Sequence, residues 1–268
     1  MEIKDNVFVV TGGGNGIGRG VVLHLLKEGA SVYALDISLS GLEETRKLAG
    51  DLANNLAFEV CDITNREHIE TLPSKVKAKF KKVDGIINVA GIIQPFIKFN
   101  DLGYDRIEKI FNVNFFGTLY MIKTFLPILL ENKTTSSIVN IGSMAGFIPY
   151  PRQSIYGASK GAIKMLSEGL YSELKDTNVK VSVVFPGAVA TDITKNSGAD
   201  LKMKEGKKAK AYKMLSVDET ADIILNTIRK EKYKALAGKD AKSMDIFYRI
   251  APKKAIHTIS KALGEYFD

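Results

Sequence analysis

The feature that most constrains the fold is a repeated alternation of short apolar segments with longer segments of helical pattern. The first unit consists of a strand, a helix and a second strand, predicted at residues 6–10, 16–28 and 31–36. Further strands are predicted at 56–60, 83–90, 136–142 and 179–185, with a short edge strand in the stretch KALAG. Several strands are apolar at almost every position, which indicates burial on both faces. The sequence therefore predicts a single α/β domain built on a doubly wound parallel sheet with helices on both faces.

A glycine-rich turn, TGGGNGIG at residues 11–18, lies between the first strand and the first helix. Glycines let the backbone approach a pyrophosphate closely, and a helix N-terminus offers free N–H groups and a partial positive charge. The glycines at 12, 16 and 18 depart from the G-x-G-x-x-G fingerprint, so a purely structural turn is the alternative. The position between strand and helix favours nucleotide binding.

Acidic residues follow the second and third strands. Asp36 ends the second strand, where a carboxylate can accept hydrogen bonds from the adenosine ribose and repel a 2′-phosphate. A helix cap or a turn is the alternative interpretation. Asp62 follows the third strand and is open to the same two interpretations.

The stretch SIYGASKGA places Tyr156 four residues before Lys160, on one face of a predicted helix. An ordinary helix surface is the alternative for this pair. Ser143 lies in IGSMAG, which lacks the G-x-S-x-G spacing of a hydrolase nucleophile and has no evident His or Asp partner. Asn114 lies in a mostly apolar helical segment, where its amide needs an internal partner.

These motifs, together with NVAG at 88–91, NVN at 112–114 and Pro186-Gly187, resemble the short-chain dehydrogenases/reductases in order and spacing. The resemblance implies a Rossmann-type sheet of about seven strands in the order 3-2-1-4-5-6-7. It also implies an NAD(P)-dependent oxidoreductase acting on CH–OH or C=O groups. One departure is Val89, where the family often has a second Asn.

The resemblance further implies a role for each catalytic residue. Tyr156 would be the general acid/base, Lys160 its activator and a ribose ligand, and Ser143 the ligand of the substrate oxygen. Asn114 would hold a relay water. A free phenol has a pKa near 10, so a neighbouring ammonium and the nicotinamide charge are needed to lower it.

The predicted cofactor contacts come from the glycine turn, the strand ends and the Tyr-Lys helix: Thr11, Gly12, Asn15, Gly16, Ile17, Gly18, Asp36, Asp62, Ile63, Asn88, Ala90, Gly91, Tyr156, Lys160, Pro186, Gly187, Val189 and Thr191. We expect NAD to be preferred over NADP because of Asp36. NADP-binding members often carry Arg or Lys at the positions held here by Asn15 and Ile37. Arg19 lies inside the first helix and is a less favoured phosphate ligand.

Residues after the fourth and fifth strands are expected to lie over the nicotinamide end, because ligands bind at the carboxyl edge of such sheets. They are Ile93, Gln94, Phe96, Phe147, Ile148 and Pro149. The predicted substrate contacts are Ile93, Gln94, Ser143, Phe147 and Tyr156. A mostly apolar pocket favours a secondary alcohol or ketone with hydrocarbon bulk, although such residues also serve as loop anchors.

The chain is expected to form one catalytic domain at residues 1–240, with a polar, lysine-rich substrate lid at 190–216. Residues 241–268 are expected to form a helical tail in which Ile256, Ile259 and Leu263 have helical spacing, with lysines nearby. Packing on the domain or on a partner subunit is the favoured interpretation. Peripheral contact with a membrane surface is the alternative.

Composition limits the remaining possibilities. The net charge of +8 is spread along the chain without a nucleic-acid motif, so we expect a small-molecule substrate and no nucleic-acid partner. Cys61 is the single cysteine, which excludes an intrachain disulfide and favours a cytoplasmic location. The three histidines lack metal-ligand spacing, so no metal is expected. We expect no transmembrane segment. We expect the protein to form a homodimer or a homotetramer.

The sequence thus predicts an enzyme that transfers hydride between NAD(H) and a secondary alcohol or ketone. A catalytically silent dinucleotide-binding sensor or scaffold is the alternative. The presence of Asn114, Ser143, Tyr156 and Lys160 together favours the enzyme, because a binder without turnover needs Lys160 at most. A basic nucleic-acid-binding protein is a third hypothesis, which a salt-dependent binding titration would test.

Overall fold

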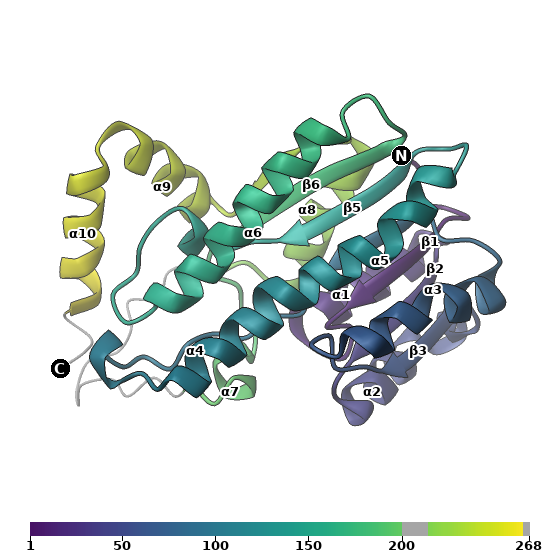
Figure 1. Cartoon of the computed structure of the whole chain (residues 1–268), viewed down its shortest axis with the longest axis horizontal. Helices are drawn as coiled ribbons and strands as arrows, with labels where there is room; N and C mark the ends of the chain where they lie inside the picture. Colours follow the sequence, from purple (N-terminus) through teal and green to yellow (C-terminus); the bar gives the residue numbers. More distant parts are fainter. Residues whose placement is uncertain (200–213, 265–268) are drawn as a thin grey trace.

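The computed structural model describes residues 1–199 and 214–264, and a parallel seven-stranded sheet forms its centre (Figure 1). The strands are β1 Val7–Thr11, β2 Ser31–Asp36, β3 Leu56–Val60, β4 Gly85–Asn88, β5 Ser136–Ile141, β6 Val179–Pro186 and β7 Lys234–Ala237. They are arranged in the order β3-β2-β1-β4-β5-β6-β7, and every pairing is parallel. The predicted fold class and strand order are therefore confirmed.

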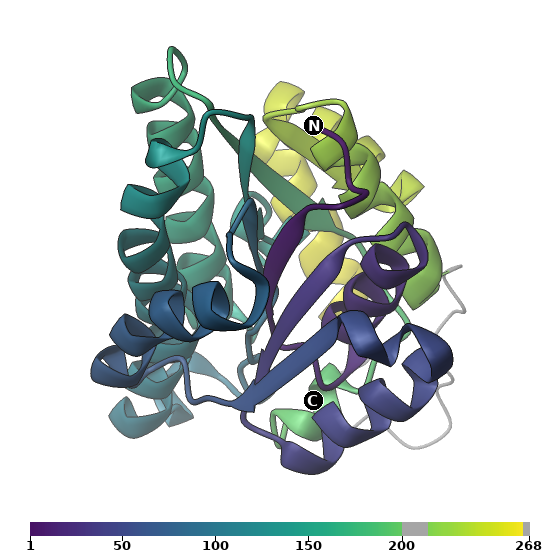
Figure 2. The same cartoon turned by 90° about the vertical axis from the view of Figure 1, so that its right-hand side faces the viewer.

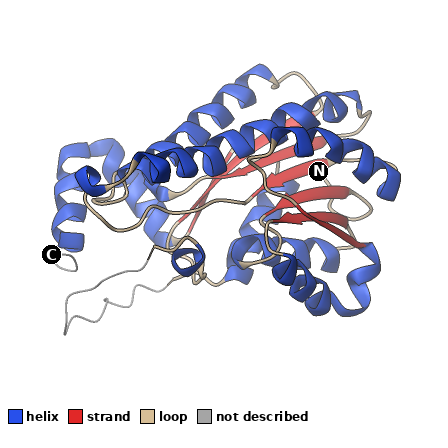
Figure 3. Cartoon of the chain, turned by 60° about the horizontal axis from the view of Figure 1, so that its bottom comes forward, coloured by secondary structure: helices blue, strands red, loops and turns tan. Residues whose placement is uncertain are grey.

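Helices cover both faces of the sheet (Figures 2 and 3). The main helices are α1 Gly16–Lys27, α2 Leu39–Ala49, α3 Arg66–Phe80, α4 Tyr104–Phe111, α5 Thr118–Glu131, α6 Ser154–Glu173, α7 Ile193–Asn196, α8 Val217–Arg229, α9 Lys239–Ile250 and α10 Pro252–Gly264. Short 3₁₀ turns are η1 Gly50–Asn55, η2 Phe99–Asp101 and η4 Met144–Gly146. Helices α1, α2 and α8 contribute to one core, and α3, α5 and α6 contribute to the other.

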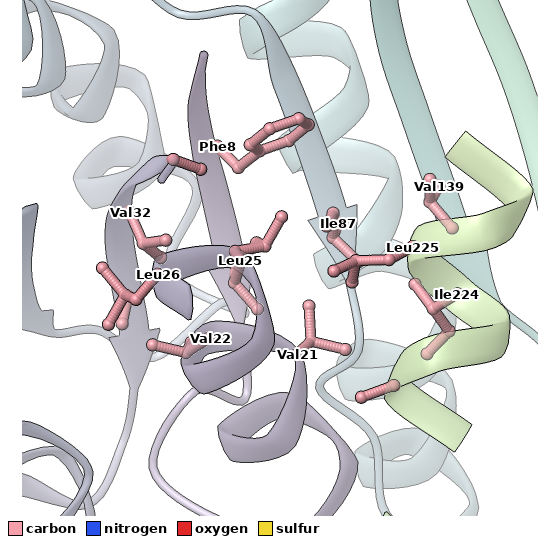
Figure 4. Close-up of a cluster of buried hydrophobic side chains, with 14 of the residues drawn as sticks. Phe8, Val21, Val22, Leu25, Leu26, Val32, Ile87, Val139, Ile224 and Leu225 are labelled. Carbon is pink, nitrogen blue, oxygen red and sulfur yellow. The ribbon is translucent and has the colours of Figure 1, made fainter. Parts of the chain in front are cut away.

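The continuous apolar character of the strands follows from this sandwich. In β1, Phe8 and Val10 point into the core that contains α1 and α8 (Figure 4), whereas Val7 and Val9 point into the opposite core. Val9 and Val10 are both fully buried. Alternate residues of one strand therefore fill two different cores, and each buried side chain contributes about 1.5–3 kcal/mol.

The segment between α4 and α5 departs from a regular helix. Residues Asn112–Gly117 form a π-helical segment, so α4, this segment and α5 make one continuous helical stretch from 104 to 131. Within the described parts of the chain, this is the one helix whose length and mean hydropathy of 1.5 would suffice to span a membrane. Its inner side chains Met121, Phe125 and Leu129 are fully buried in the second core. This packing is that of a core helix.

The C-terminal helices α9 and α10 lie at the left end of the molecule in Figure 1, and α9 begins directly after β7. Helix α9 contacts β7, and α10 packs along α9 with Ala255 and Ile259 buried. Ile246 and Ile250 of α9 are exposed. The structure describes α7 within the predicted lid, whereas residues 200–213 lie outside the described parts. The extent of the lid and the domain boundary therefore stay predictions.

Candidate functional site

The glycine-rich turn between β1 and α1 fits the close approach of a phosphate group. Gly12 and Gly16 have φ angles of +72° and +48°, a region that favours glycine. A Cβ on Gly18 would lie 2.0 Å from the carbonyl oxygen of Gly12, so a side chain does not fit there. Asn15 caps α1 by accepting a hydrogen bond of 2.7 Å from the Gly16 amide. The next N–H groups belong to the open first turn of α1, and a helix N-terminus of this kind offers donors and a partial positive charge to an anion.

A cavity of about 350 Å³ extends from this turn along the carboxyl ends of β2, β3 and β4. Most of the predicted cofactor residues line it: Gly12, Asn15, Gly16, Ile17, Gly18, Asp36, Asp62, Ile63, Ala90, Gly91 and Thr191. Sequence reasoning missed other wall residues: Leu35, Ile37, Cys61, Val89, Ile92, Lys109, Val113, Ile193 and Asn196. Cys61 and Ile37 flank predicted residues in the sequence, whereas Lys109 and Asn196 reach the cavity only through the tertiary fold.

Asp36 lies beside the glycine turn because β2 pairs with β1. Its Oδ2 accepts a hydrogen bond of 2.9 Å from the Gly14 amide, and its Oδ1 accepts one of 2.9 Å from the Ser38 amide. These bonds fix the carboxylate in the cavity wall and leave lone pairs for further donors such as hydroxyls. The neighbouring Ile37 is 71% exposed and brings no charge.

Arg19 lies closer to this region than its position inside α1 suggested. Its Nη2 donates to the carbonyl oxygens of Gly14 and Gly41, and its Nε donates to Thr45 Oγ1 at 3.1 Å. The guanidinium and the Asp36 carboxylate therefore both bond to Gly14. The guanidinium holds α2 against the glycine turn, and these donors are already engaged.

Some predicted cofactor residues support the cavity instead of lining it. Thr11 Oγ1 accepts hydrogen bonds from the amides of Val89 and Ala90 at 3.0 and 3.1 Å, which holds the end of β4 beside the turn. Asn88 is buried and donates to Asn140 Oδ1 at 2.8 Å.

Three further predicted residues, at the end of β6 and just after it, do not line the cavity. The Gly187 amide donates to the Ala237 carbonyl at 2.8 Å, and Val189 forms a β-bridge with Leu215. Pro186 ends β6 beside Ala237. These contacts fix the chain that leads to Thr191.

Ser143 and Tyr156 meet where β5 ends and α6 begins. Ser143 follows β5, and its Oγ accepts a hydrogen bond from the Ala145 amide at 3.2 Å. The Ser143 hydroxyl also lies close enough to the Tyr156 phenol to influence its pKa. Burial raises the pKa of the Tyr156 phenol, and the Ser143 hydroxyl partly opposes that rise in pKa.

Lys160 lies one turn after Tyr156 on α6 and is 5% exposed. Its Nζ donates to the carbonyl oxygen of Ile141, at the end of β5, at 2.9 Å. Burial lowers the pKa of Lys160 to about 8, because the charged ammonium loses its hydration. A Cβ placed on Gly91 would lie 3.3 Å from the Lys160 Nζ, so this ammonium adjoins the cavity wall.

Asn114 lies in the π-helical segment, and its amide group is fully engaged. Its Oδ1 accepts a hydrogen bond from the Ile92 amide at 2.8 Å, and its Nδ2 donates to the Ile92 carbonyl at 3.0 Å. The same Nδ2 donates to Ser159 Oγ at 2.9 Å. The side chain therefore joins the loop after β4 to α6. The Asn114 main-chain carbonyl accepts a hydrogen bond from Thr118 Oγ1 at 3.1 Å, and the water-holding role of Asn114 stays a prediction.

Gln94, predicted as a substrate contact, is fully buried and turned toward α6. Its Oε1 accepts a hydrogen bond from the Ile155 amide at 2.9 Å, and its carbonyl oxygen accepts one from Gln153 Nε2 at 2.7 Å. Gln94 thus binds the N-terminus of the helix that carries Tyr156.

The other residues expected over the nicotinamide end are placed as follows. Ile93 is 7% exposed, and its amide donates to Ser197 Oγ at 3.0 Å. Phe147 packs edge-on against Phe185 with ring centroids 5.4 Å apart, and Ile148 is fully buried. Phe96 is partly buried, and Pro149 is exposed.

Tyr150 is a residue that sequence reasoning missed. Burial raises the pKa of its phenol to about 12, with smaller contributions from the charges of Asp240 and Tyr156. Its hydroxyl is therefore within electrostatic reach of the Tyr156 phenol. Nothing in the spacing of the loop after β5 distinguishes Tyr150 from a surface aromatic residue.

Two of the three histidines contact carboxylates away from the cavity. His24 lies between Asp218 and Asp222 at 3.0 and 2.9 Å, and His68 contacts Glu59 at 2.6 Å. Among residues 1–199 and 214–264, no group of three or more His, Cys, Asp or Glu side chains is arranged to hold a metal ion.

Comparison with known proteins agrees with this geometry. A family model described as short chain dehydrogenase matches residues 6–202. The chain is 30% identical over 272 residues to SadH, named as an oxidoreductase, of Mycobacterium tuberculosis, covering 99% of this chain and 98% of that protein. It is 34% identical over 196 residues to an uncharacterised oxidoreductase of Staphylococcus saprophyticus, covering 72% of this chain and 82% of the relative.

Solved structures share the fold. A short chain dehydrogenase/reductase from Burkholderia phymatum in complex with NAD has a TM-score of 0.84 at 22% identity and covers 95% of this chain and 96% of its own. A short chain dehydrogenase from Burkholderia cenocepacia in complex with NADP has a TM-score of 0.79 at 25% identity. The match covers 97% of this chain and 99% of that chain. The same architecture therefore accommodates either nicotinamide dinucleotide.

Proposed function

The chain belongs to the short-chain dehydrogenase/reductase family, and we propose on that premise that it transfers hydride between NAD(H) and a secondary alcohol or ketone. The observation that carries the proposal is that Ser143, Tyr156 and Lys160 lie together between the end of β5 and the start of α6, with the Lys160 ammonium beside Gly91 of the cavity wall. Apolar residues around Ile93 and Phe147 favour a substrate with hydrocarbon bulk.

The proposed mechanism assigns one task to each side chain. When bound, the nicotinamide supplies or accepts the hydride and, in its oxidised form, carries a positive charge. Ser143 donates a hydrogen bond to the substrate oxygen, and Tyr156 gives or takes the proton of that oxygen. Lys160 stabilises the phenolate form through its ammonium and binds the nicotinamide ribose hydroxyls from the side of Gly91.

Asn114 is proposed to act through the backbone. Its amide is bonded to Ile92 and Ser159, so the relay water would bind at the main chain of this segment, at the Asn114 carbonyl that also accepts from Thr118 Oγ1. A π-helical segment shifts the backbone bonding register, and such segments often mark functional sites. This arrangement supports a proton path from Lys160 toward solvent.

The preference for NAD over NADP is proposed from Asp36. Its carboxylate is fixed at the cavity wall by the amides of Gly14 and Ser38, where it can accept bonds from both adenosine ribose hydroxyls. A 2′-phosphate would meet this negative charge in a partly desolvated place. The Nε and Nη2 donors of Arg19 are engaged elsewhere, so they do not compensate. If repulsion and lost hydrogen bonds amount to about 2–4 kcal/mol, NAD is preferred about thirty- to a thousandfold in kcat/KM.

The proposal is tested with Tyr156→Phe and a panel of ketones and secondary alcohols, following reduced-nicotinamide absorbance with each cofactor. We expect the variant to lose turnover while its NADH affinity stays within about tenfold of the wild type, because Lys160 still binds the ribose. Near-normal turnover of the variant would contradict the mechanism. Wild-type protein that binds NADH but turns over no member of a broad panel would favour a silent sensor.

A further inference from the structure

The cavity that we assign to the dinucleotide has an unusual balance of charge in its wall. Two carboxylates, Asp36 and Asp62, line it, and within the described parts of the chain the one cationic side chain in the wall is Lys109 of α4. The diphosphate of a dinucleotide is an anion, and the open end of α1 supplies only the partial positive charge of a helix N-terminus. Lys109 has no part in the mechanism proposed above.

The position of Lys109 directs it into this cavity. Val113 lies one turn further along the same helical stretch and lines the same cavity, so the two side chains share a helix face. Ile92 and Asn196 form the wall near them. The glycine turn at the start of α1 lines the same cavity, so an anion held there shares this space with Lys109.

The cavity is narrow where the diphosphate would bind. The Thr191 methyl carbon lies 3.4 Å from the place of a Cβ on Gly16, so the segment leading to α7 closes over the turn. A ligand group between the turn and α4 would therefore be partly desolvated, which strengthens its interaction with a nearby ammonium.

The Lys109 side chain is available for a ligand. It is exposed, and among the described residues it has neither an ion pair nor a hydrogen bond. Arg106 lies one turn earlier on α4 and already has a protein partner, because its Nη2 donates a hydrogen bond to the Ser197 carbonyl. This bond holds the end of α7. Of these two neighbouring cations, only Lys109 is free within the described structure.

We propose that Lys109 is a positioning residue whose ammonium binds the cofactor diphosphate from the side opposite the α1 N-terminus. This inference rests on the proposed function, since it presupposes a dinucleotide in this cavity. The lysine stem is long and flexible, which suits a point charge that closes on a phosphate after binding. It also offsets the negative field of Asp36 and Asp62 during association.

The test measures equilibrium binding, without turnover, of NADH, ADP-ribose and adenosine to the full chain by calorimetry. The variants are Lys109→Gln, the conservative Lys109→Arg, and the matched control Lys123→Gln, which removes an exposed charge from α5 outside the cavity. We expect Lys109→Gln to bind NADH and ADP-ribose about tenfold more weakly at low ionic strength, with adenosine binding unchanged. Lys109→Arg and Lys123→Gln should bind like the wild type, and added salt should shrink the difference.

The outcomes separate this inference from the proposed function. Wild-type protein that fails to bind NADH would overturn both. Wild-type protein that binds NADH, with Lys109→Gln binding it equally well, would overturn the role of Lys109 alone. An equal loss for adenosine would also overturn the diphosphate assignment, because adenosine lacks phosphate.

Discussion

Replacing Lys160 with methionine should stabilise the free protein even as it removes a residue proposed for catalysis. Lys160 is 5% exposed, and its Nζ has a neutral carbonyl, that of Ile141, as its partner. Its pKa falls from the ordinary 10.5 to about 8 because the ammonium is desolvated. Each pKa unit corresponds to about 1.4 kcal/mol, so at pH 7 the charged lysine costs the fold about 3 kcal/mol. Methionine fills a similar volume without that charge.

The sign of the pH dependence follows from the depressed pKa. Between pH 8 and pH 10.5 the unfolded chain holds the Lys160 proton while the folded protein releases it. The stability of the wild type relative to Lys160→Met therefore rises with pH through that window, and the cost is fully present below pH 8. From pH 7 to pH 10 the unfolding free energy of the wild type should rise by about 2 kcal/mol relative to that of Lys160→Met.

The assay is urea unfolding of the wild type and Lys160→Met, without cofactor, at pH 7 and pH 10. Comparing the two pH values removes contributions that do not titrate, such as the lost hydrogen bond to Ile141. The same variant should bind NADH more weakly and lose turnover, because the ribose ligand and the phenol's neighbouring charge are gone. A difference in unfolding free energy that does not change between the two pH values would refute the reasoning.

Further predictions concern the cofactor cavity. Asp36→Ala should weaken the use of NAD and improve the use of NADP together, measured as kcat/KM with each. A wild type that uses both equally would contradict the role of Asp36. Gly18→Ala should lower NADH affinity by more than about tenfold and reduce the melting temperature, because its Cβ would lie 2.0 Å from the Gly12 carbonyl. Gly169→Ala is the control, since nothing lies within 4 Å of its Cβ position and Ala favours helices.

The fold could be predicted from the sequence because its strands are short, apolar and separated by helical segments. The strand predicted at 31–36 coincides with β2 Ser31–Asp36, and that at 56–60 coincides with β3 Leu56–Val60. The strand predicted at 83–90 is longer than β4 Gly85–Asn88, because apolar character continues into the loop that lines the cavity. Burial on both faces leaves the same pattern in a strand and in the buried start of a loop.

The π-helical segment could not be predicted, because its residues keep the apolar periodicity of an ordinary helix. What distinguishes it is tertiary: the Asn114 amide bonds to Ile92, 22 residues away, and to Ser159, 45 residues away. Gln94 was interpreted as a substrate contact for a similar reason, since its position after β4 is correct but its side chain turns to Ile155. Position along a strand end predicts proximity to a site, whereas the direction of a side chain depends on partners that are distant in sequence.

Under the proposed roles, the free protein holds its acid/base pair in a poorly activated state. Burial moves the pKa of Tyr156 upward and that of Lys160 downward, so desolvation opposes the charged form of both groups. The ammonium that should stabilise a phenolate is itself half deprotonated near pH 8. Ribose hydroxyls that hydrogen-bond to Lys160 and a positive charge above Tyr156 would shift both equilibria toward the charged forms. Proton transfer at Tyr156 is therefore expected to depend on an occupied cofactor cavity, which couples the binding of the dinucleotide to the chemistry of the site.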